Sequence, residues 1–84
     1  MVVSGLVQGV FFRDTCRRVA AVHGVAGWVR NRPDGRVEAV FEGAPESVEA
    51  LVVWSRRGPS DAEVTGVDVY DEPPEGLSGF MIRP

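Results

Sequence analysis

Apolar residues recur with two different spacings along the 84-residue chain, and these spacings divide it into predicted helices and strands. In two stretches the apolar residues recur every three or four positions, which predicts helices with one buried face. Between them, apolar residues alternate with polar ones or form short β-branched runs, which predicts strands. Glycine, proline and aspartate separate these segments and mark turns.

The predicted order is strand, helix, strand, strand, helix, strand, with a short extra strand at the end. The strands are Val2–Gly5, Val25–Asn31, Arg36–Glu42, Glu63–Tyr70 with a bulge at Gly66, and Phe80–Arg83. The first helix spans Phe12–His23 and ends at Gly24, and the second follows Gly43, has Pro45 in its first turn and ends at Gly58 and Pro59. The turn at residues 33–35 joins the second and third strands into an antiparallel hairpin.

This order is the split βαβ arrangement of the ferredoxin-like sandwich, an α+β fold with an antiparallel sheet and two helices on one face. Residues 1–84 are predicted to form a single domain. The faces expected to pack on the sheet are Phe12, Cys16, Val19, Ala20 and His23 on the first helix, and Val48, Leu51, Val52 and Ser55 on the second. Cys16 is therefore expected to be buried, and His23 to lie at the edge of the core rather than act in catalysis.

Composition narrows the function classes. Apolar residues make up 44% and charged residues 25%, which is typical of a globular domain. One cysteine cannot form an intrachain disulfide, and no segment has the apolar length of a signal peptide or of a membrane helix. We expect a cytoplasmic monomer with no membrane or nucleic-acid partner.

Charge is unevenly distributed along the chain. The net charge is −3, yet six of the nine arginines lie in the first 36 residues beside only two acids. Broad nucleic-acid binding usually needs a basic face on a basic protein, so this pattern fits one local anion site better. A chance clustering of arginines on solvated faces explains the charges equally well.

Glycines and an arginine mark the connection from the first strand to the first helix. Its residues are Gly5, Leu6, Val7, Gln8, Gly9, Val10, Phe11, Phe12 and Arg13. Glycines let successive N–H groups converge on an anion, and the helix that follows adds free N–H groups and a positive dipole end. Arg13 can supply two parallel donors to a phosphate. A tight turn beside a surface arginine remains the alternative.

The second unusual position is Asn31, at the end of the second strand. Asparagine is a poor strand residue and a common turn residue, so it can simply punctuate the hairpin. Its neutral amide can instead orient a water beside a bound phosphate, where an aspartate would repel the dianion.

Together these segments resemble the acylphosphatase family. The resemblance rests on residues 5–13, on Gly27-Trp28-Val29-Arg30-Asn31 and on Asp34-Gly35-Arg36-Val37-Glu38. It continues through Phe41-Glu42-Gly43, Trp54, Gly58-Pro59 and Phe80-Met81-Ile82-Arg83, so it covers nearly the whole chain. The family usually has a basic or polar residue in place of Leu6.

The resemblance implies hydrolysis of acyl phosphates to carboxylate and inorganic phosphate, without metal or cofactor. It further implies that Arg13 binds the phosphate, that the amides of residues 5–12 complete the site, and that Asn31 positions the water. Inorganic phosphate or sulfate is expected to occupy the same site.

Two alternatives use the same fold. One is a non-catalytic anion- or RNA-binding module, and RNA recognition on this fold uses aromatic side chains on the open face of the sheet. The strand-placed aromatics are Trp28, Phe41, Tyr70 and Phe80, and they lack the basic aromatic motif of such modules. The acylphosphatase-like domain of a larger carbamoyl-transfer maturation protein would come with zinc-finger cysteines, whereas this sequence has only Cys16.

Overall fold

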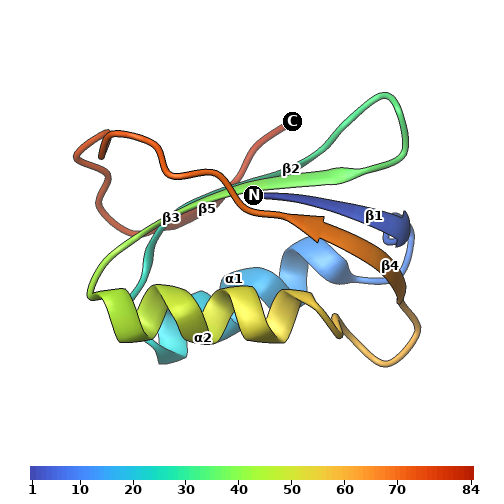
Figure 1. Ribbon diagram of the computed structural model, residues 1–84, viewed down its shortest axis with the longest axis horizontal. Helices are drawn as coiled ribbons and strands as arrows, with labels where there is room; N and C mark the ends of the chain where they lie inside the picture. The colour runs from blue at the N-terminus through green and yellow to red at the C-terminus, as the bar shows by residue number, and fades with distance from the viewer.

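The computed structural model describes all 84 residues and contains one five-stranded sheet in the order β4-β1-β3-β2-β5 (Figure 1). The strands are β1 (Val2–Leu6), β2 (Ala26–Asn31), β3 (Val37–Glu42), β4 (Glu63–Asp68) and β5 (Phe80–Ile82). The helices are α1 (Phe12–Val22) and α2 (Pro45–Ser55), and both lie against the same face of the sheet (Figure 1). The predicted α+β fold with split βαβ order is confirmed.

The last strand makes the sheet mixed. Strands β4, β1, β3 and β2 pair antiparallel as predicted, whereas β5 lies parallel to β2, with Val29 opposite Ile82. The long connection after β4 brings the chain back so that β5 enters in the direction of β2 (Figure 1). The Gly27 N–H donates to the Gly79 carbonyl and the Arg83 N–H to the Val29 carbonyl, each at 2.9 Å.

An irregularity in the β1–β4 pair extends β1 beyond its predicted end. The register shifts between Ser4 and Gly5, which leaves Thr65 as the extra residue on β4, next to the predicted bulge at Gly66. Gly5 has φ +121°, and a Cβ there would overlap the Glu63 carbonyl. The glycine is therefore required by close strand packing, and the strand continues through Leu6.

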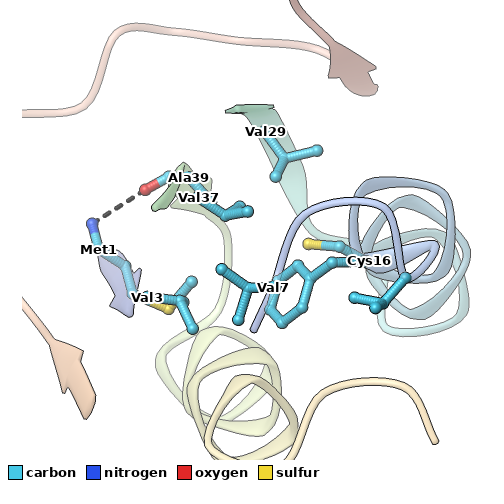
Figure 2. Close-up of a cluster of buried hydrophobic side chains, with 9 residues drawn as sticks. Met1, Val3, Val7, Cys16, Val29, Val37 and Ala39 are labelled. Atoms are coloured by element: carbon cyan, nitrogen blue, oxygen red, sulfur yellow. Dashed lines mark hydrogen bonds between the residues drawn. The ribbon is translucent and has the colours of Figure 1, made fainter. Parts of the chain in front are cut away.

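The core lies between the sheet and the helices (Figure 2). Its main cluster consists of Met1, Val3, Val7, Val10, Phe12, Cys16, Val29, Val37 and Ala39. On α1, Phe12, Cys16 and Ala20 are buried, so the prediction for Cys16 is confirmed. The predicted place of His23 at the edge of the core is wrong, because α1 ends at Val22 and His23 leaves the helical geometry with an exposed side chain.

Strand direction determines which segments meet. Because β1 and β2 both run antiparallel to β3, they run parallel to each other, and β5 follows β2. The carboxyl ends of these three strands, at Leu6, Asn31 and Ile82, therefore lie at the same end of the sheet, where the connection to α1 also begins. Neither helix has the length and hydropathy needed to cross a bilayer.

Candidate active site

The connection between β1 and α1 presents unpaired amides. Val7 and Phe12 are buried in the core, 1% and 2% exposed, and fix both ends of this loop. Within it, Gly9 (φ 74°) and Phe11 (φ 63°) adopt left-handed backbone conformations. The N–H groups of residues 7–11 donate to no carbonyl and no side chain of the protein. They form a group of free donors at the start of α1, where further N–H groups are free by helix geometry.

Phe11 holds the loop in a strained form. A bulky side chain in the left-handed region is a genuine outlier and costs about 1–2 kcal/mol. Phe11 nevertheless is the N-cap residue of α1, with φ 63° and ψ 26° and no side-chain capping bond. Strain of this kind persists where the surrounding structure imposes it, and it is typical of functional sites.

Arg13 brings an unpaired positive charge to the loop. It is half-buried in the first turn of α1, with no carboxylate within ion-pair distance and no side-chain hydrogen bond. Its neighbour Asp14 is already paired with Arg17 and Arg18, at 3.1 and 3.0 Å. The Arg13 guanidinium is therefore available to an anion in the loop.

Asn31, the last residue of β2, provides an unpaired hydrogen-bond acceptor at the same end of the sheet as the loop. Its side chain lies on the helix-facing side of β2, as does that of Val29 two residues earlier. The Oδ1 atom is buried and has no hydrogen-bond partner. An unsatisfied buried acceptor costs about 1–3 kcal/mol, so its presence here calls for a functional explanation.

Gln8 fastens the loop to the hairpin that contains Asn31. Its side-chain nitrogen donates to the Arg32 carbonyl at 2.8 Å and to the Arg36 carbonyl at 2.9 Å. Both carbonyls belong to the turn between β2 and β3. The sequence analysis predicted that Gln8 belongs to an anion-binding loop, and the structure shows that its side-chain N–H groups hold that loop in place.

A pocket of about 330 Å³ brings the predicted groups together. Its lining comprises Val7, Gly9, Phe11, Phe12, Arg13, Asp14, Asn31 and Ile82. Of the predicted site residues, Gly5 and Leu6 lie in β1, and Gln8 and Val10 lie in the loop but do not line the pocket. Sequence reasoning missed Asp14 and Ile82. Asp14 is adjacent to Arg13, but nothing local indicates that Ile82 lines the same pocket as Asn31.

Two other hollows lack this combination. A groove of about 450 Å³ between β3 and residues 69–74 is lined by Glu42, Asp71 and Glu72 and by no arginine, so its charge disfavours an anion. A hollow of about 570 Å³ near the end of α1 includes Arg17 and Arg18, but both are paired with Asp14.

The one cysteine is not a nucleophile for this site. Cys16 is fully buried in the core, and burial raises the pKa of its thiol to about 12. The thiolate, which is the reactive form, is therefore negligible near neutral pH. The structure has no cluster of three or more His, Cys, Asp or Glu side chains that could hold a metal ion.

A family model, related sequences and solved structures all indicate the same family for this chain. Residues 1–82 match the family model described as Acylphosphatase. The chain is 58% identical over 82 residues to an acylphosphatase of Rubrobacter xylanophilus, covering 96% of this chain and 74% of that protein. The crystal structure of an acylphosphatase from Bacillus subtilis superposes with a TM-score of 0.94 at 37% identity, covering 99% of this chain and 93% of that one. Full-length HypF superposes with a TM-score of 0.89 at 25% identity, but over only 11% of its chain.

Proposed function

The chain belongs to the acylphosphatase family, and from this premise we propose which residues bind the substrate and which orient the water. The enzyme hydrolyses acyl phosphates, which are carboxyl–phosphate anhydrides, to a carboxylate and inorganic phosphate. In our proposal, Arg13 and the free amides of residues 7–12 bind the phosphate, and Asn31 positions the attacking water. The observation behind this assignment is one pocket lined by Arg13, whose guanidinium is unpaired, by the loop with its free amides, and by Asn31, whose Oδ1 has no hydrogen-bond partner.

The charge balance of the pocket supports phosphate binding. The unpaired cation is Arg13, whereas Asp14 is neutralised by two arginines. A guanidinium can donate two parallel hydrogen bonds to phosphate oxygens, and the amides of the loop and of the first turn of α1 can meet the remaining ones. The phosphoryl group is expected to sit against the loop, with the acyl group directed outward.

The proposed chemical step is attack of water on phosphorus. The Asn31 Oδ1 accepts a hydrogen bond from the water and fixes its oxygen in line with the bond to the leaving carboxylate. The new phosphorus–oxygen bond forms as the phosphorus–carboxylate bond breaks, and the carboxylate leaves with the bonding electrons. The proton lost by the water passes to a phosphate oxygen, so no side-chain base is required.

Positioning and electrostatic stabilisation account for the rate in this scheme. The transition state of phosphoryl transfer is loose and spreads charge over the three equatorial oxygens. Donors already fixed in the loop can stabilise that charge without reorganising. We further propose that residues 1–84 act as one catalytic unit, since the pocket is lined by the loop, α1, β2 and β5, and its buried residues Val7 and Phe12 belong to the main core cluster.

The test compares Arg13→Ala with Arg57→Ala, which removes an exposed arginine at the end of α2. Calorimetry with inorganic phosphate measures binding, and release of phosphate from benzoyl phosphate measures turnover. We expect Arg13→Ala to lower kcat/KM by about 10³, or about 4 kcal/mol, and to abolish phosphate binding. Arg57→Ala should match the wild type. Equal phosphate affinity in wild type and Arg13→Ala would remove Arg13 from its assigned role.

A further inference from the structure

The pocket has an order from its floor to its open side. Val7 and Phe12 are buried and form the floor, while Arg13 and Asn31 are half-buried. The remaining apolar lining residues, Phe11 and Ile82, are 76% and 38% exposed. A residue that lines a pocket and is also exposed lies at the rim, so two apolar side chains flank the opening.

The position of Phe11 is fixed by its neighbours. Val10 and Phe12 are both buried in the core, at 9% and 2% exposure. Between them the left-handed backbone of Phe11 turns its side chain out of the core, and Phe11 also lines the pocket. An aromatic ring held outward at a strained position is unlike the isolated exposed apolar residues that every surface contains.

The position of Ile82 is fixed by sheet pairing. Ile82 lies opposite Val29 in the parallel β2–β5 pair, so its side chain shares the helix-facing side with Val29 and with Asn31. The Arg83 N–H donates to the Val29 carbonyl at 2.9 Å and anchors the end of β5. Ile82 therefore lies on the same face of the sheet as Asn31, the residue proposed to hold the attacking water, and lines the same pocket.

We propose that Phe11 and Ile82 form an acyl-binding subsite that favours acyl phosphates with an apolar, above all an aromatic, acyl group. This inference rests on the proposed function, because it takes the phosphate to be held against the loop by Arg13. With the phosphate there, the acyl group extends toward the rim and contacts these two side chains. A ring can stack against Phe11, whereas the methyl group of an acetyl substrate is too small to reach both side chains.

The experiment measures kcat/KM for benzoyl phosphate and for acetyl phosphate in wild type, Phe11→Asn, Phe11→Tyr and Ile82→Thr. Asparagine tolerates the left-handed conformation, and threonine keeps the β-branched shape preferred in strands, so both variants should keep the fold. Val22→Ser is the matched control, since Val22 is 83% exposed on α1 and lies outside the pocket. Affinity for inorganic phosphate, which has no acyl group, provides a second measurement.

We expect Phe11→Asn to reduce the preference for benzoyl over acetyl phosphate about tenfold, which corresponds to about 1.4 kcal/mol. Ile82→Thr should reduce the preference less, and Phe11→Tyr and Val22→Ser should retain it. Phosphate affinity should stay within about twofold of wild type in Ile82→Thr and Val22→Ser, which leave the phosphate-binding loop intact.

Two results would overturn the subsite. One is an unchanged ratio in both Phe11→Asn and Ile82→Thr. The other is an equal loss for both substrates, which would make Phe11 a residue that shapes the loop rather than one that contacts the acyl group. Failure of the proposed function looks different, because Arg13→Ala would then bind phosphate as tightly as wild type.

Discussion

The two helices begin in the same way along the chain but present different chemistry. Each follows a strand of the sheet, and neither N-cap residue makes a side-chain hydrogen bond. At α2, the N-cap Ala44 is extended, Pro45 lacks an N–H, and the Ala44 carbonyl accepts from the N–H groups of Ser47 and Val48 at 3.0 Å. At α1, Phe11 is left-handed and the preceding loop leaves its N–H groups free.

This difference shows what a helix N-terminus needs in order to bind an anion. Both helices have a positive dipole end, worth only about 0.3–1 kcal/mol to a nearby negative charge. At α2 the carboxylate of Glu46 lies in the first turn and supplies that charge internally. At α1 the corresponding acid, Asp14, is neutralised by two arginines, so Arg13 and the free amides remain for a ligand.

Among the variants that keep Arg13, removal of the Asn31 amide should have the largest effect on turnover. Asn31→Ala is expected to lower kcat about 10²–10³-fold, as loss of a positioned polar group does in other active sites. Phosphate affinity should stay within about twofold, because Asn31 is assigned to the water and not to the phosphate. Steady-state kinetics and calorimetry measure the two quantities separately.

Stability provides an independent check on Asn31. Since its Oδ1 is buried without a partner, alanine at this position removes an unsatisfied acceptor. The free energy of unfolding from urea titration should therefore be unchanged, or higher by about 1 kcal/mol. A variant that loses stability together with activity would show that Asn31 is primarily structural.

A smaller effect on kcat/KM is expected when the loop before α1 loses its hydrogen bonds to the β2–β3 hairpin. Gln8→Ala removes the donor to the Arg32 and Arg36 carbonyls. We expect kcat/KM to fall about tenfold, because a small displacement of the groups around the reacting atoms lowers the rate. The free energy of unfolding should fall by about 1–2 kcal/mol, because two hydrogen bonds are lost. Gln8→Glu keeps the shape without the N–H donors and should behave in the same way. Wild-type kinetics in both variants would contradict this positioning role.

The acids in the first turns of the two helices allow a matched pair of substitutions. Asp14 lines the pocket and pairs with Arg17 and Arg18, so Asp14→Asn should leave both arginines unpaired and raise phosphate affinity about two- to threefold at low ionic strength. Glu46→Gln at α2 should leave phosphate affinity unchanged while lowering stability by about 0.3–1 kcal/mol. The gain for Asp14→Asn should diminish at high salt. Equal affinity changes at the two helices would mean that the pocket does not distinguish α1 from α2.

The contrast between the helices was only partly predictable from sequence. Local pattern placed both helices, the hairpin and the buried Cys16, because amphipathic periodicity depends on neighbouring residues. It placed His23 wrongly, since the helical stripe was extended one residue past the end of α1. The parallel pairing of β5, which puts Ile82 on the same face of the sheet as Asn31, depends on where a long connection returns to the sheet. Likewise, the bracing contact of Gln8 joins residues far apart in sequence, so no local pattern indicates it.

The smallest effect on activity is expected from chemical modification inside the helices. Each helix buries one polar side chain, Cys16 on α1 and Ser55 on α2. The Ser55 hydroxyl donates to the Leu51 carbonyl at 2.7 Å, whereas burial raises the pKa of the Cys16 thiol from 9.0 to about 12. Between these pH values the unfolded chain ionises while the folded protein stays protonated, so stability should fall as the pH rises above 9. Near neutral pH, iodoacetamide should leave the folded enzyme unlabelled and fully active, with labelling appearing only in urea. Labelling of the folded protein at the unfolded rate would show that Cys16 is accessible and that the core beneath α1 opens readily.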